Sequence, residues 1–72
     1  MKKEFTPGRY LHYKGNYYIA LDTVKHSETE EVLVLYKPEN NDQLWVRPLT
    51  MFLEEIEIEG ERRPRFLYIS SR

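Results

Sequence analysis

The sequence predicts a small all-β fold, and three observations support this fold class. Short runs of aromatic and β-branched residues recur along the 72 residues, separated by clusters of Gly, Pro, Asn and Asp. Hydrophobic residues make up 40% of the chain and aromatic residues 14%, which is enough for one core. A second core does not fit into this length, so we expect residues 1–72 to form a single domain.

The first two runs predict a hairpin. Residues 8–13 and 17–24 have the composition of strands and flank the turn-forming segment Lys14-Gly15-Asn16. Gly15 can adopt the positive φ that tight turns require.

The next two runs differ in their pattern. The segment from Val32 to Tyr36 is apolar on both faces, as expected for a strand with neighbours on each side. The segment 44–47 alternates, which predicts that Leu44 and Val46 point inward and that Trp45 and Arg47 point outward. Pro48 lacks a backbone donor and should end the pairing.

The last third predicts a helical turn followed by two strands. Residues 49–53 suit one short helical turn, and residues 54–60 alternate again up to a turn at Gly60. Residues 65–69 form the closing strand, which Pro64 marks as an edge strand. Phe52 is expected to anchor the turn in a core with Leu33, Leu35, Val46 and Ile56.

A helical turn before the fifth of five or six short strands is typical of a small SH3-like antiparallel barrel. An OB-type barrel is the main alternative, but it carries a longer helix between its third and fourth strands. No such helix fits between Tyr36 and Leu44. Closure of the barrel would make the terminal strands neighbours and pool basic residues from both ends of the chain, so that Arg9 would share a face with Arg62, Arg63 or Arg65.

Charge and composition restrict the function classes. The net charge is only −1, which argues against non-specific nucleic-acid binding, although both ends of the chain are basic. The chain has no Cys, which excludes a disulfide scaffold, a zinc ribbon and a thiol nucleophile. No apolar run approaches the length of a membrane span and no secretory signal is evident, so the expected location is cytoplasmic.

Four motifs resemble those of a small bacterial family that is known only as a domain of unknown function. The resemblance covers roughly residues 8–66 and has the motifs in the same order. They are His12-Tyr13-Lys14-Gly15-Asn16, His26-Ser27-Glu28-Thr29, Leu44-Trp45-Val46-Arg47-Pro48 followed by Met51-Phe52, and Pro64-Arg65-Phe66. The resemblance implies a bacterial cytoplasmic protein, and it assigns no catalytic residue.

Two chemical interpretations of these motifs are weak. His26, Ser27 and Glu28 are the residue types of a hydrolytic triad, but neighbours in an extended chain point to opposite faces. His12 and His26 could meet Asp22 or Glu28 around a metal, although two histidines without tight spacing are a poor metal motif. We therefore predict no catalytic residue, no metal site and no cofactor.

Trp45 and Arg47 are the strongest candidates for a binding site. They lie two residues apart, so they share one face of a strand, and Trp with Arg is a frequent composition of interaction hot spots. We expect Tyr10, His12 and the loop from His26 to Glu28 to complete the patch.

The preferred function is a non-enzymatic binding module for an unknown peptide or protein. The alternatives are a nucleic-acid or nucleotide binder, which would use the basic ends and exposed aromatic rings, and a small hydrolase or metal-dependent enzyme.

Overall fold

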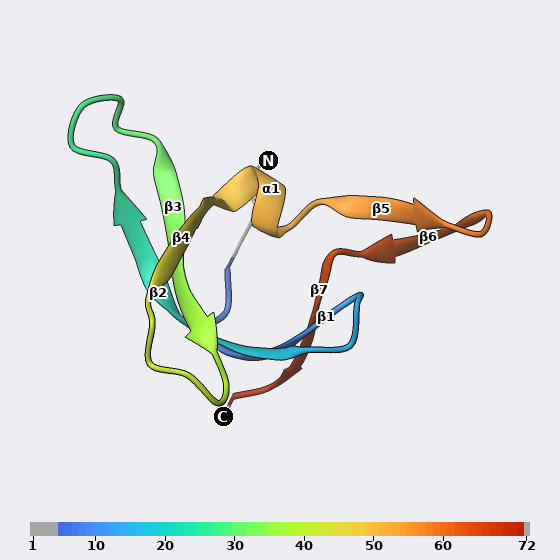
Figure 1. Ribbon diagram of the computed structural model, residues 1–72. Helices are drawn as coiled ribbons and strands as arrows, with labels where there is room; N and C mark the ends of the chain where they lie inside the picture. The colour runs from blue at the N-terminus through green and yellow to red at the C-terminus, as the bar shows by residue number, and fades with distance from the viewer. Residues whose placement is uncertain (1–4, 72) are drawn as a thin grey trace.

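A computed structural model describes residues 5–71, which form antiparallel strands and one short helix (Figure 1). The predicted all-β fold with one helical turn is confirmed. The elements in chain order are β1 (Gly8–His12), β2 (Tyr17–Lys25), β3 (Val32–Pro38), β4 (Trp45–Pro48), α1 (Leu49–Phe52), β5 (Glu55–Ile58), β6 (Glu61–Pro64) and β7 (Phe66–Ser70).

Five strands form one sheet in the order β4-β3-β2-β1-β7, and each neighbouring pair is antiparallel. The sheet curves strongly but does not close into a barrel, because β4 and β7 remain its two edges (Figure 1). The terminal strands β1 and β7 are neighbours as predicted, and β7 is an edge strand. Gly15 has a φ of 102° in the predicted turn between β1 and β2.

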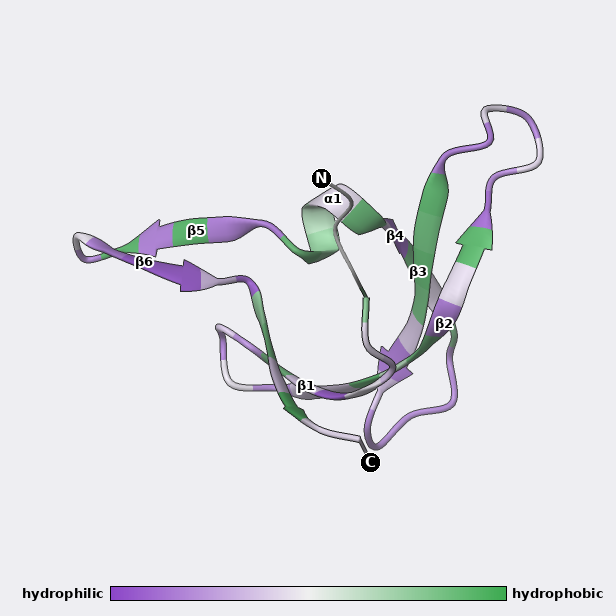
Figure 2. Ribbon diagram, turned by 180° about the vertical axis from the view of Figure 1, so that it is seen from behind, coloured by the Kyte–Doolittle hydropathy of each residue, from purple (hydrophilic) through white to green (hydrophobic). Residues whose placement is uncertain are grey.

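Strands β5 and β6 pair only with each other and form a separate hairpin. Its two-residue turn places Glu59 at φ 50° and Gly60 at φ 83°, as a type I′ turn requires. Both views of the ribbon show this largely hydrophilic hairpin projecting away from the curved sheet (Figure 2). The sequence did not reveal β6, because Glu61–Pro64 is charged and exposed on both faces.

The core lies on the concave side of the sheet and consists mainly of aromatic rings. Helix α1 covers this side and inserts Phe52, which is fully buried as predicted. Its predicted companions were wrong: Leu33, Leu35 and Ile56 are only partly buried, and Val46 is exposed. The buried cluster is Tyr10, Ala20, Val34, Tyr36, Phe52 and Phe66.

Candidate functional site

The register of β4 places Trp45 and Arg47 on the concave side of the sheet. Trp45 pairs with Tyr36 and Arg47 pairs with Val34, and directly paired residues of antiparallel strands point to the same face. The predicted inward orientation of Leu44 and Val46 was therefore wrong. Their side chains remain about half exposed, at 48% and 51%. Alternation gave the wrong orientation for β4 because the apolar ring of Trp and the aliphatic stem of Arg can face a core while their polar ends reach water.

Arg47 contacts the edge of the aromatic core. Its guanidinium carbon lies 5.7 Å from the centre of the Phe66 ring, which is a cation–π distance. Its Nε atom is buried and has no hydrogen-bond partner among the described residues. Within residues 5–71, Arg47 is also the one arginine without a carboxylate partner. The paired ones are Arg9 with Glu39, Arg62 with Glu55, Arg63 with Glu61 and Arg65 with Glu54.

These ion pairs offset the positive charge on which the predicted basic face depends. Arg9 stacks on the Tyr17 ring at 3.7 Å and bonds Glu39 at 2.5 Å, whereas Arg65 contacts Glu54 at 3.3 Å. The two terminal strands are adjacent, but of these arginines only Arg9 lies on one of them. Arg62 and Arg63 lie on β6 and Arg65 precedes β7, and each is paired with a different glutamate. Lys2, Lys3 and Arg72, which also contribute to the basic ends, lie outside the described residues.

His12 lies on the same concave face as Arg47. Its ring packs at 4.8 Å from the Phe66 ring, and its Nδ1 accepts a hydrogen bond from the Lys14 backbone N–H at 3.2 Å. An accepting Nδ1 places the proton of the neutral ring on Nε2. Burial lowers the pKa of His12, and the positive charges of Arg47, Arg65 and Lys14 lower it further.

We expect this lowered pKa to make stability fall in mildly acidic solution. Because the folded protein protonates His12 less readily than the unfolded chain does, the free energy of unfolding should be constant above about pH 7. As the pH falls below about 6.5, the unfolded chain gains its proton first, and stability decreases until the folded His12 also titrates. Urea unfolding of the wild type and of His12→Phe at several pH values between 7.5 and 5 measures the difference.

His26→Gln is the control, because it removes a histidine but leaves His12 in place. This variant should keep the wild-type decline, while His12→Phe should show a flatter profile. Identical profiles for the wild type and His12→Phe would refute the assignment. The Glu39 carboxylate affects stability only at lower pH, because its hydrogen bond with Arg9 lowers its pKa.

Two further predicted site residues, His26 and Glu28, lie in the loop at the tip of the β2–β3 hairpin. This loop begins beyond the Lys25–Val32 pair, which lies two residues or about 7 Å along β3 from Val34, the position opposite Arg47. His26 Nδ1 accepts backbone bonds from Glu28 at 3.1 Å and Thr29 at 3.4 Å. His26 therefore organises its own loop.

Tyr10, also predicted for the patch, is part of the core. Its side chain is 4% exposed, and its hydroxyl donates to the Thr6 carbonyl oxygen at 2.5 Å. Trp45, Arg47 and His12 thus share the concave face, and Tyr10 belongs to the buried cluster of the core.

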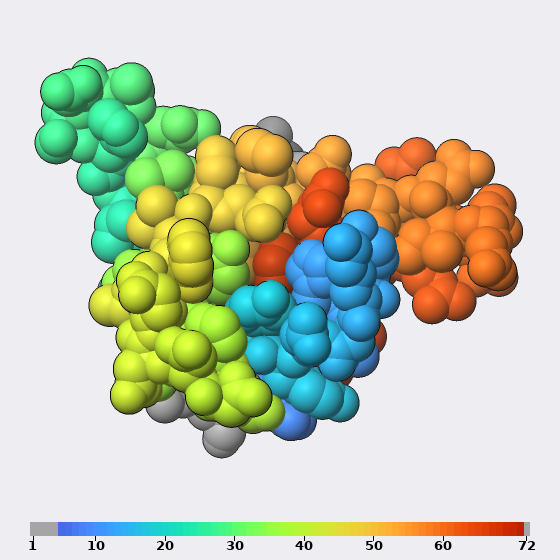
Figure 3. All heavy atoms as spheres, in the orientation of Figure 1, coloured from blue at the N-terminus to red at the C-terminus, as the bar shows by residue number. Residues whose placement is uncertain are grey.

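Three residues near this face were not among the predicted binding residues: Tyr18, Arg65 and Phe66. Phe66 forms the floor, with the ring of Tyr18 at 5.6 Å and that of Tyr36 at 5.8 Å. The Pro64-Arg65-Phe66 motif was a signal for two of them. Atoms of β4 (yellow) and of the β1–β2 hairpin (blue) flank deeper atoms from the start of β7 (red) in Figure 3.

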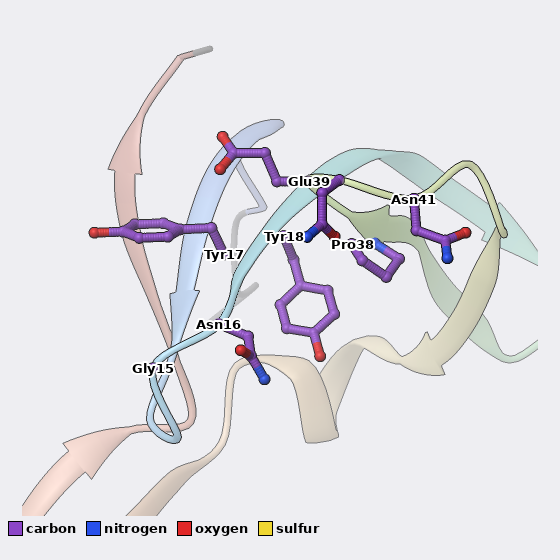
Figure 4. A pocket seen from close by; sticks show the side chains of 8 residues that line it. Gly15, Asn16, Tyr17, Tyr18, Pro38, Glu39 and Asn41 are labelled. Carbon is purple, nitrogen blue, oxygen red and sulfur yellow. The ribbon is translucent and has the colours of Figure 1, made fainter.

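A polar cleft adjoins this face at the start of β2. It has a volume of about 470 Å³ and lies between the β1–β2 turn and the loop that follows β3. Tyr18, whose ring is part of the aromatic face, also lines the cleft, together with Asn16 and Asn41 (Figure 4). The concave face therefore continues from a cationic and aromatic region into one with amide and hydroxyl groups.

Residues 5–71 contain no group of three His, Cys, Asp or Glu side chains placed to hold a metal ion. None of the described helices has the length and apolarity needed to cross a membrane.

The comparisons with known proteins agree on one family. Residues 8–68 match the model of the family described as "Protein of unknown function (DUF1653)". The chain is also similar to a DUF1653 protein from Bordetella bronchiseptica whose crystal structure is known. The two are 33% identical with a TM-score of 0.86, over 96% of this chain and 92% of that one. No curated protein matches. The chain therefore belongs to the DUF1653 family of proteins of unknown function.

Proposed function

We propose that this protein is a small non-enzymatic binding module that recognises a peptide segment of a protein partner on its concave face. One observation carries the proposal. Trp45, 54% exposed at the edge of the sheet, shares a face with the one described arginine that has no carboxylate partner. An exposed Trp offers a large contact area at little entropic cost, and an unpaired guanidinium adds a directional anchor.

The pairing of the other arginines favours a peptide over a nucleic acid. Nucleic-acid binding draws its affinity from several Lys or Arg contacts to phosphates. Here the remaining arginines of residues 5–71 are each bound to a glutamate, which leaves a single uncompensated guanidinium on the concave face. One such anchor suits a ligand with one acidic group. We place this module in the bacterial cytoplasm, in keeping with its cysteine-free sequence.

A random peptide library displayed on phage tests this function. The wild-type protein should enrich peptides that contain an acidic residue. Trp45→Ala should bind the selected peptides about 30-fold more weakly or worse, as expected on losing a hot-spot residue. Because the Trp45 side chain is more than half exposed, the melting temperature should change little. Fluorescence anisotropy gives the affinities, and thermal unfolding followed by circular dichroism gives the stability.

Val46→Ala is the matched control, since Val46 is equally exposed but points to the opposite face of β4. It should bind the selected peptides as the wild type does. Equal weakening by both variants, or unfolding of Trp45→Ala, would contradict the proposed site. Retention of a pool of single-stranded oligonucleotides, with no peptide enriched, would favour the nucleic-acid alternative instead.

A further inference from the structure

Two nitrogen-bearing side chains from separate strands contact the Phe66 ring, and a third, Arg65, belongs to the residue that precedes Phe66. Arg47 comes from β4, His12 ends β1, and Arg65 immediately precedes β7. Arg47 and His12 both contact Phe66, at 5.7 Å and 4.8 Å from the ring centre. The Arg65 guanidinium lies 6.0 Å from the ring of Tyr13, the neighbour of His12, and the charges of both arginines lower the pKa of His12.

Each of the three has a hydrogen-bond donor that no described residue occupies. The Nε atoms of Arg47 and Arg65 are both buried and have no partner. The Nδ1 of His12 is occupied by the Lys14 N–H, so its Nε2–H is the donor that remains. A buried donor without an acceptor costs about 1–3 kcal/mol, and an acceptor supplied by a ligand would recover that free energy.

The charge of the cluster sets the charge of its ligand. Arg65 already bonds Glu54 through Nη2 at 3.3 Å, which offsets its charge. His12 is held in its neutral form by burial and by its cationic neighbours. Among these three groups one uncompensated positive charge therefore remains, that of Arg47, and the Lys14 ammonium acts on His12 from outside them. The charge of Arg47 matches a monoanion better than a dianion.

We propose that Arg47, Arg65 and His12 form a binding site for a single carboxylate, which is the group the peptide ligand inserts. The inference rests on the proposed function and specifies the chemistry that this face recognises. A carboxylate has two oxygens that together accept about four hydrogen bonds, and its geometry matches the fork of a guanidinium. Arg47 would supply charge and direction, while neutral His12 would donate from Nε2. Trp45 would then cover the apolar part of the same residue or its neighbour.

Acetate is the probe that isolates this chemistry from the rest of the peptide. We expect acetate, titrated into ¹⁵N-labelled protein in place of chloride at constant ionic strength, to cause saturable NMR shifts. The shifts should be confined to the Arg47 and Arg65 Nε–H groups, to His12 and to their neighbours. Arg47→Gln should weaken acetate binding about tenfold or more, because a hydrogen bond to a charged group is lost. Shifts that are linear, or that persist unchanged in Arg47→Gln, would overturn the proposal.

Arg62→Gln is the matched control for the loss of one positive charge, since Arg62 pairs with Glu55 on the projecting hairpin. It should bind acetate as the wild type does. His12→Phe keeps an aromatic ring against Phe66 but removes the donor, so it should weaken acetate binding several-fold while the amide spectrum remains folded. Unchanged acetate affinity in His12→Phe would remove His12 from the site.

Three further results test the carboxylate assignment and separate it from the function on which it rests. Inorganic phosphate binding more than tenfold tighter than acetate would overturn the assignment to a carboxylate. Selected peptides that bind Arg47→Gln and the wild type equally would refute the carboxylate site while leaving peptide binding intact. Acetate binding at Arg47 without any enriched peptide would uphold the site and refute the proposed function.

Discussion

Replacing Phe52 by alanine is expected to lower the free energy of unfolding by about 3–5 kcal/mol. The Phe52 side chain is completely buried, stacks on Phe66 at 4.2 Å, and meets the edges of Tyr10 at 5.1 Å and Tyr36 at 5.7 Å. Its removal would leave a cavity that the neighbouring rings, including Phe5 at 6.0 Å, cannot fill. A domain of this size has about 5 kcal/mol of stability in total, so the variant should retain about 2 kcal/mol or less. Chemical denaturation followed by tryptophan fluorescence measures the effect.

Met51→Ala is the matched control, because Met51 precedes Phe52 in the same helix and is 45% exposed. Its loss should change stability by no more than about 1 kcal/mol. A Phe52→Ala protein with the wild-type denaturation midpoint would show that α1 does not anchor the core.

The second large effect is expected at Gly8, where β1 meets β7. Gly8 has a φ of 152°, a conformation that other residues rarely adopt. A Cβ at this position would collide with the Ser70 carbonyl oxygen and lie 3.1 Å from the Tyr68 ring. Gly8→Ala should therefore cost about 1–3 kcal/mol in backbone strain and a similar amount in overpacking. Loss of amide protection along β7 in hydrogen exchange would reveal where the damage occurs.

Gly15→Ala separates the two contributions. Gly15 also has a positive φ, 102°, but a Cβ there would meet nothing within 4 Å. This variant should show only the backbone cost, and a Gly8→Ala protein no less stable than Gly15→Ala would contradict the predicted clash.

The local features of the fold could be predicted from the sequence because their causes are local. Alternation and turn residues located the strands of the main sheet, and Gly15 and Gly60 located two turns. The faces of β4 could not be predicted, because they depend on its register with β3. Whether the sheet closes depends on which distant edges pair, and Glu55–Ile58 pairs with the adjacent charged segment rather than with an edge of the main sheet.

The candidate site was only partly predictable for the same reason. Trp45, Arg47 and His12 could be named from their residue types and family motifs. Arg65 was named only for the predicted basic face and within a family motif, because its proximity to His12 arises from the pairing of His12 with Phe66 between β1 and β7. The loop of His26 lies at the tip of the β2–β3 hairpin, and its position relative to the other candidate residues depends on the register of these strands.

The projecting β5–β6 hairpin offers a place to modify the molecule without disturbing the proposed recognition face. Its strands bond mainly to each other, and its outer end is the exposed pair Glu59 and Gly60. A fluorophore or an affinity tag attached there would extend into solvent, away from the curved sheet (Figure 1).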